Sequence, residues 1–326
     1  MTLLQKTNLI VFTVIALFLN ANLIAQNNIN AKTFYKHDKY LSSDKMEGRF
    51  PGTKQSNKAA RYIKRHFKRY GMEKFDKNYY QSFKLFVKPG INKMKSDTVT
   101  TQNVVGFIEG SDDVLKKEFI VVGAHYDHWG WGGKESGSKI KDTVAIHNGA
   151  DDNASGVAAL LSILEELSNS KNKPKRSIIF IAFSGEEEGL LGSKYFVDHL
   201  PVDKSAVKVM FNMDMVGRLN AEKQLYMGGA GTFPGGVELM KRLTMGSGLN
   251  PIIHAGEVGG SDHVSFYKSN ISAVGFHTGG HPQYHTPEDD IEFINSEGGA
   301  LVCKYIYNAL IEIANYQQPL YFINQN

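Results

Sequence analysis

The sequence of 326 residues contains one cysteine, Cys303, so no intrachain disulfide is possible. Cys303 lies within an apolar helical pattern, which predicts that it is a small residue of the core. An excess of charge is also missing, because 37 Lys and Arg against 33 Asp and Glu give a formal net charge of +4. A nucleic-acid-binding protein usually concentrates basic residues on one surface. We therefore expect no nucleic-acid partner.

The apolar stretch at residues 9–19 is too short for a comfortable membrane span, which takes about 20 residues. It follows the positively charged Lys6 and precedes a plausible cleavage site at 23–25, so residues 1–25 are predicted to be a secretory signal peptide. The alternative is an uncleaved N-terminal anchor. We expect an exported chain, periplasmic or secreted, with no stable membrane insertion after signal cleavage. Without disulfides, such a chain depends for its stability on its core and on metal.

The sequence has no internal repeat, low-complexity tract or linker, which favours a single domain over residues 26–326. Residues 79–110 are irregular and β-rich, and we expect them to form an inserted hairpin. Fully apolar strands are expected at 119–123, 177–183 and 207–213, with a later strand at 271–276. Helices are expected at 54–70, 154–167, 189–200 and 295–316. This alternation predicts an α/β fold, a three-layer α/β/α sandwich around a mixed, mainly parallel sheet.

Side chains that commonly bind metal come directly after the predicted strands. His125 follows the first strand, Glu186 and Glu187 follow the second, and Asp214 follows the third. Ligand sites of open α/β sheets lie at the carboxyl ends of the strands. Zinc binds imidazole nitrogens and carboxylate oxygens, and His285 further along the chain adds a second imidazole. The order His, Asp, Glu, Asp, His therefore predicts a site for a pair of zinc ions.

Two zinc ions roughly 3.5–4 Å apart need a ligand that they share. An aspartate in a tight loop can present both oxygens, and Asp151 lies between Gly149 and Gly156, which allow the turn. We therefore predict Asp151 as the bridge. Taken alone, residues 151–153 could instead cap a helix or form a calcium-type loop, and residues 186–188 could be a solvated helix start. The five residues together make these separate explanations poor.

Six ordered segments resemble the M28 family of zinc peptidases, the co-catalytic two-zinc aminopeptidase type that also includes glutamate carboxypeptidases and glutaminyl cyclases. The resemblance extends from about residue 40 to the C-terminal helix. The segments are 125–128 (HYDH), 149–156 (GADDNASG), 186–193 with GLLGS at its end, 213–215 (MDM), 261–263 (SDH) and 284–287 (YHTP). The lead-in at 47–53 also matches.

The resemblance implies a ligand set. One zinc ion would take His125, Asp214 and one oxygen of Asp151. The other would take Glu187, His285 and the second oxygen of Asp151. The peptide bond between Asp151 and Asp152 would be cis. His128 lies near the motifs, but the family pattern does not require it as a ligand, and it is left out of the predicted set.

The resemblance also implies catalytic roles. Glu186 would be the general base, which accepts a proton from metal-bound water and delivers it to the leaving amine. Asp127 would hold the ring of His125 in orientation. Tyr284 would help to stabilise the oxyanion, with simple packing as the alternative. Asp262 would be a hydrogen-bonding acid near the site.

The function implied is an exported aminopeptidase that hydrolyses N-terminal residues from peptide substrates, with two zinc ions bridged by Asp151. One alternative is a glutaminyl cyclase-like acyltransferase with a single zinc ion, and a second is a carboxypeptidase or dipeptidase on the same fold. A third is an inactive binding module. The complete ligand set and the intact base at Glu186 argue against the first and the third alternatives.

Overall fold

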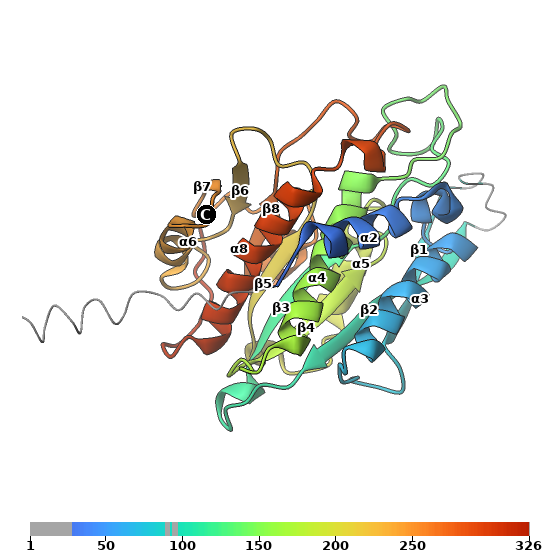
Figure 1. Cartoon of the computed structure of the whole chain (residues 1–326). Helices are drawn as coiled ribbons and strands as arrows, with labels where there is room; N and C mark the ends of the chain where they lie inside the picture. Colours follow the sequence, from blue (N-terminus) through green and yellow to red (C-terminus); the bar gives the residue numbers. More distant parts are fainter. Residues whose placement is uncertain (1–27, 89–91, 93–96, 326) are drawn as a thin grey trace, which may run out of the picture.

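The computed structural model describes residues 28–88, 92 and 97–325, and the predicted signal peptide at 1–25 lies outside the described residues. One eight-stranded sheet runs through the described part (Figure 1). Its strands are β1 (Tyr80–Phe86), β2 (Thr98–Ile108), β3 (Phe119–His125), β4 (Ser177–Phe183), β5 (Val207–Met213), β6 (Gln224–Gly228), β7 (Asn250–Ile253) and β8 (Ser272–His277). The α-helices are α2 (Ala31–Leu41), α3 (Lys54–Arg69), α4 (Gly156–Asn169), α5 (Leu191–Asp198), α6 (Gly236–Thr244), α7 (His263–Lys268) and α8 (Ser296–Asn315).

The strand order is β1-β2-β4-β3-β5-β8-β6-β7. The central strands β4, β3, β5 and β8 pair in parallel, and β6 pairs in parallel with β7. The pairs β1–β2, β2–β4 and β6–β8 are antiparallel. The predicted mixed, mainly parallel sheet is thus confirmed. Residues 79–110 supply the hairpin β1–β2, which extends the sheet beyond β4.

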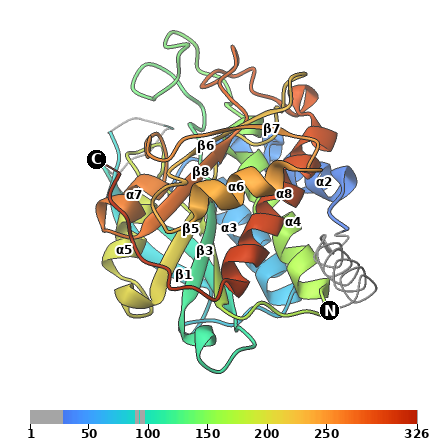
Figure 2. The ribbon, with the colours of Figure 1, turned by 90° about the vertical axis from the view of Figure 1, so that its left-hand side faces the viewer.

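The central strands are largely apolar because helices cover both of their faces. All seven residues of β4 are buried, so alternation between polar and apolar residues is not needed. The same pattern made β4 and β5 predictable to the residue at 177–183 and 207–213. Figure 2 shows the sheet edge-on, with α5 and α7 on one side and α4 and α8 on the other.

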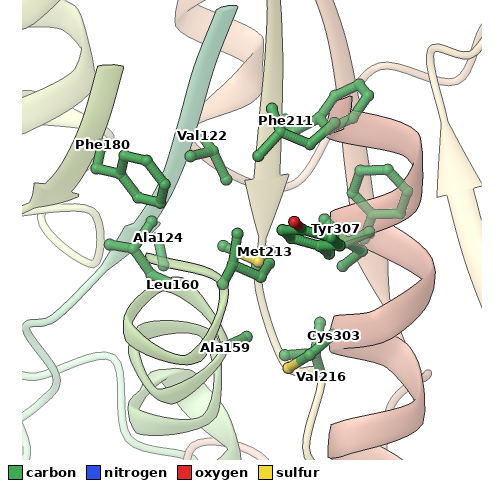
Figure 3. Close-up of a cluster of buried hydrophobic side chains, with 14 of the residues drawn as sticks. Val122, Ala124, Ala159, Leu160, Phe180, Phe211, Met213, Val216, Cys303 and Tyr307 are labelled. Carbon is green, nitrogen blue, oxygen red and sulfur yellow. The ribbon is translucent and has the colours of Figure 1, made fainter. Parts of the chain in front are cut away.

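The larger hydrophobic cluster lies between the sheet and the side covered by α4 and α8. In Figure 3, Phe180, Val122 and Phe211 of three strands lie in one cluster with Leu160 of α4 and Tyr307 of α8, and Cys303 of α8 lies beside Val216. Cys303 is fully buried, as predicted, and burial raises the pKa of its thiol. The opposite face of the sheet packs on α5 and α7 through Phe196 and Phe266. The three layers of the prediction are therefore present.

Two features near the N-termini of helices differ from the sequence prediction. The sequence pattern predicts no element at Ala31–Leu41, but this segment forms α2, which begins after the capping side chain of Asn30 and packs on α4 and α8. The helix expected from residue 154 begins at Gly156 instead, because Ala150–Ser155 form a separate wide turn. No helix among the described residues has the length and apolar character needed to cross a membrane.

The substitution Leu160→Ala tests the core between the sheet and α4. Leu160 is fully buried, so replacing its isobutyl group with a methyl group should lower the free energy of unfolding by about 2–5 kcal/mol. The control is Val114→Ala, because Val114 is 74% exposed and its truncation should change stability by less than about 0.5 kcal/mol. Denaturant unfolding measures both variants, and equal small losses would contradict this description of the core.

Candidate metal centre

The carboxyl ends of the parallel strands bring the predicted site residues together. His125 is the last residue of β3, Glu186 and Glu187 follow β4, and Asp214 follows β5. His285 lies in the loop after β8. The strands pair in parallel in the order β4, β3, β5, β8, so their ends lie side by side at one edge of the sheet.

The carboxylate of Asp152 lies between the two predicted imidazoles. Its Oδ1 is 3.3 Å from Nε2 of His125, and its Oδ2 is 3.0 Å from Nε2 of His285. His125 Nε2 also lies 3.4 Å from Oδ1 of Asp214. His285 Nε2 lies 3.3 Å from Oε2 of Glu187. Four of the five predicted ligands thus converge, and both oxygens of Asp152 face them.

The prediction that Asp151 bridges the two metal ions is wrong by one residue in this structure, because Asp152 is the residue that lies between the imidazoles of His125 and His285. The Oδ1 of Asp151 accepts a hydrogen bond of 2.7 Å from the backbone N–H of Gly217, and its Oδ2 lies 3.4 Å from Nε2 of His281. The side chain of Asp151 therefore points away from the place that Asp152 occupies. The cis peptide bond is also displaced by one residue and joins Asp152 to Asn153.

His128 is not among the predicted ligands, but it lies beside Glu187 and Asp152 in the site. Its Nδ1 donates to Oε1 of Glu187 at 2.6 Å and lies 3.8 Å from Oδ2 of Asp152. The ring is fully buried. The signal in the sequence was the spacing of His128 three residues after His125, in the loop that leaves the end of β3.

Backbone hydrogen bonds hold the loop that carries Asp152. The carboxylate of Asp289 accepts from the N–H of Asp151 at 3.1 Å and from the N–H of Asp152 at 3.0 Å. Gly149 begins the turn with a φ of +57°, and a Cβ there would lie 2.1 Å from the carbonyl oxygen of Asp152. Asn153 donates to the carbonyl of Met213 at 2.9 Å, which ties this loop to the end of β5.

The donor atoms of the site fit zinc. Two groups have three possible ligand atoms within 4.8 Å of one another among the described residues, and both include Asp152. The first group adds His125 and Asp214, and the second adds His128 and Glu187. The Nε2 of His125 is buried and makes no hydrogen bond of acceptable geometry, although two carboxylate oxygens lie nearby. A cation that binds imidazole and carboxylate together would satisfy this nitrogen.

The three residues predicted to be catalytic lie around these groups. Glu186 and Tyr284 line a cavity of 190 Å³ beside Asp152. The ring of Tyr284 stacks on the ring of His285, with the ring centroids 3.8 Å apart. Asp127 does not line the cavity, but its Oδ1 accepts from the backbone N–H of Glu186 at 3.3 Å. The backbone carbonyl of Asp127 lies 3.3 Å from Nδ1 of His125.

The electrostatics of the site follow from burying several acids together. Burial and the neighbouring carboxylate of Glu187 raise the pKa of Glu186 well above its usual range, against the opposing effect of His125. Burial raises the pKa of Asp262 to about 7. Burial alone would lower the pKa of His125, but Asp214 and Glu186 hold it well above its usual value. The site therefore favours positive charge at its centre.

Comparisons with known proteins agree on one family. The model of Peptidase family M28 matches residues 103–309. Aminopeptidase YwaD of Bacillus subtilis is 33% identical over 232 residues, which cover 67% of this chain and 47% of that protein. Leucine aminopeptidase 2 of Trichophyton equinum is 29% identical over 234 residues, which cover 69% of this chain and 43% of that protein. The chain spans about half the length of the curated relatives it matches.

Solved structures show the same fold at low sequence identity. BSAP, a zinc aminopeptidase from Bacillus subtilis, superposes with a TM-score of 0.70 at 19% identity. The aligned residues make up 88% of this chain and 96% of BSAP. The glutaminyl cyclase of Porphyromonas gingivalis superposes with a TM-score of 0.69 at 17% identity. The aligned residues make up 88% of this chain and 99% of the cyclase.

The substitution Asp289→Ala tests how the loop of Asp152 is held. It leaves the buried N–H groups of Asp151 and Asp152 without their acceptor, so the free energy of unfolding should fall by about 2–4 kcal/mol. Denaturant unfolding in the presence of a chelator measures this effect without a contribution from metal. The control Glu288→Gln changes an exposed neighbour and should have little effect. A loss no larger than that of the control would contradict the anchoring role of Asp289.

Proposed function

Because the chain belongs to peptidase family M28, we propose that it is a zinc-dependent aminopeptidase that hydrolyses the N-terminal residue from peptides. The observation that carries the proposal is the carboxylate of Asp152, whose two oxygens face two separate groups of zinc-type donors. The names of the relatives, an aminopeptidase and a leucine aminopeptidase, support the same reaction class.

One zinc ion would bind on each side of Asp152, and His285 rather than His128 would be the imidazole ligand of the second ion, because its Nε2 lies close to both Asp152 and Glu187. His125 and Asp214 would bind one ion, Glu187 and His285 would bind the other, and Asp152 would bridge the two. His128 would hold Glu187 in orientation through their hydrogen bond of 2.6 Å. Zinc ions bound in this way lower the pKa of water toward about 7 and polarise a carbonyl group.

The side chains around the donor groups would move the protons and hold the substrate. Glu186 lines the cavity beside Asp152, and its carboxylate would accept a proton from the attacking water and donate it to the leaving amine. Asp127 would fix the turn at Glu186 by accepting its backbone N–H. Tyr284 would donate its phenolic O–H to the carbonyl oxygen of the scissile bond, where negative charge develops.

The size of the cavity favours attack at the end of a peptide. Its volume of 190 Å³ is smaller than the roughly 300–1,000 Å³ of pockets for drug-sized ligands. Four glycines, Gly228, Gly259, Gly260 and Gly275, contribute to its lining and leave room for one side chain. The acids Asp152, Glu186 and Asp214 at the cavity would attract the positive N-terminal amine of a peptide. We also infer export from the signal-like residues 1–25.

Metal retention distinguishes the bridging aspartate from its neighbour. We expect Asp152→Asn to weaken zinc binding at least about tenfold, because an NH2 group, which does not bind zinc, replaces one of the two carboxylate oxygens that face the donor groups. Asp151→Asn is the matched control and should retain zinc, because its side chain faces Gly217 and His281. Competition with a chelator of known affinity measures both variants. Weaker binding in Asp151→Asn than in Asp152→Asn would reverse the assignment.

Activity assays test the reaction itself. The zinc-loaded protein should release p-nitroaniline from aminoacyl p-nitroanilides and should leave the N-acetylated compounds intact. Glu186→Gln should retain its zinc and lose about 10²–10⁴-fold in kcat, because an amide cannot accept the proton. Glu188→Gln is the adjacent control and should stay within a few-fold of the wild type. Cyclisation of an N-terminal glutamine without release of other residues would contradict the aminopeptidase proposal.

A further inference from the structure

The side chain of Arg49 is fully buried near the candidate metal centre, although it takes no part in the proposed chemistry. Its guanidinium group donates four hydrogen bonds, and all four acceptors are backbone carbonyl oxygens. These are the carbonyls of Tyr126 at 2.7 Å, Leu41 at 2.6 Å, Asn148 at 2.7 Å and Gly149 at 3.0 Å.

The four carbonyls belong to three separate parts of the chain. Tyr126 directly follows the ligand His125, and Asn148 and Gly149 lead into the turn that carries Asp152. Leu41 ends α2, which packs on α4. One planar side chain therefore joins the segment that directly follows His125 and the turn that carries Asp152, here called the two ligand loops, to the helix α2.

The backbone around Arg49 takes an unfavourable conformation to make this connection. Glu47 and Arg49 have φ values of +44° and +53°, in the left-handed region that non-glycine residues seldom adopt. Between them, a Cβ at Gly48 would lie 2.3 Å from the carbonyl oxygen of His147. The carboxylate of Glu47 also accepts from Nε1 of Trp131 at 3.2 Å. Such strain persists only where surrounding contacts hold it, and it is often found at functional sites.

A simple ion pair does not explain the buried charge. Among the residues that the structure describes, no carboxylate oxygen lies within 4.0 Å of the guanidinium nitrogens of Arg49. Burial lowers the pKa of Arg49 to about 10, against the opposing effect of nearby carboxylates that include Asp38, Asp127 and Asp152, so the group still carries its charge at neutral pH. The planar guanidinium group holds its N–H donors in fixed, diverging directions, so it can bind several carbonyls that lie on different sides of it. The ammonium group of a lysine is a single compact centre and cannot bind all of these carbonyls at once.

We propose that Arg49 is a positioning residue that sets the two ligand loops in their metal-binding arrangement before metal binds. The inference rests on the proposed zinc site and adds to it the reason why His125 and Asp152 face each other. Arg49 acts through the backbone at Tyr126, Asn148 and Gly149, and it contacts neither the metal nor the substrate.

A second buried arginine supplies a matched control. Arg176 is 1% exposed and donates to Oε2 of Glu118 at 2.8 Å and to the carbonyls of Ile313 and Tyr316. It precedes Ser177, the first residue of β4, whereas Glu186 and Glu187 follow the last residue of this strand. Loss of Arg176 should therefore weaken the fold at the end of the sheet away from the metal centre.

The experiment compares Arg49→Lys with Arg176→Lys. Zinc dissociation constants are measured by chelator competition, and the visible absorption spectrum of the cobalt-substituted protein reports the ligand geometry. We expect Arg49→Lys to weaken metal binding by about 10- to 100-fold and to alter the cobalt spectrum. Arg176→Lys should stay within about twofold of the wild type, with the wild-type spectrum. If the lysine variants do not fold, Arg49→Gln and Arg176→Gln avoid burying an ammonium group and replace them.

The outcomes separate this inference from the proposed function. Failure of the wild type to bind zinc would overturn the proposed function, whereas wild-type affinity and spectrum in a folded Arg49 variant would overturn the role of Arg49 alone. Equal losses in the Arg49 and Arg176 variants would also overturn it, because they would indicate general destabilisation. Hydrogen exchange of the wild type in a chelator gives a test without substitution. Peptides that cover 126–130 and 148–152 should stay protected, and free exchange there would show that metal, rather than Arg49, orders the loops.

Discussion

The architecture of this site depends on several buried carboxylates that face the same small space. Asp152, Glu187 and Asp214 converge on the imidazoles of His125 and His285 within hydrogen-bonding or near-contact distance. Like charges buried together repel, and desolvation adds to the cost of keeping them ionised. A site of this kind becomes favourable when cations occupy it, which is the physical reason for assigning it to metal.

The fold supplies the rigid frame that keeps these carboxylates in place. Parallel strands covered on both faces bring the ends of β3, β4 and β5 to one edge, and the turn before α4 adds Asp152. The neighbouring acids bind the backbone instead of facing the donor groups. Asp289 accepts hydrogen bonds from the backbone N–H groups of this turn, and Asp151 accepts one from the N–H of Gly217. Carboxylates thus both face the proposed metal ions and hold the backbone that presents them.

The sequence allowed much of this arrangement to be predicted, because continuous apolar strands and the polar residues that follow them are local signals. The strands β4 and β5 and the convergence of His125, Glu187 and Asp214 follow from such signals, whereas the prediction of His285 rests on its imidazole and on the family resemblance. The choice between Asp151 and Asp152 does not. These residues are adjacent and chemically identical, and their directions depend on partners such as Asp289 and Gly217, which lie 138 and 66 residues from Asp151.

Other features escaped prediction for the same reason. The contribution of His128 depends on how the loop after β3 turns toward Glu187, which lies 59 residues away. The role of Arg49 depends on carbonyls up to 100 residues away and on left-handed backbone that propensity disfavours. The helix α2 has many polar residues, and two of them, His37 and Asp38, are buried, which becomes clear only when α4 and α8 pack beside it.

The most direct test of the account is the number of zinc ions bound to each chain. The protein would be purified without chelators, supplied with zinc, passed through gel filtration and counted by elemental analysis against its polypeptide concentration. The account predicts two zinc ions per chain, one for each donor group that shares Asp152. One zinc ion per chain, or none, after zinc has been supplied would contradict the bridged site.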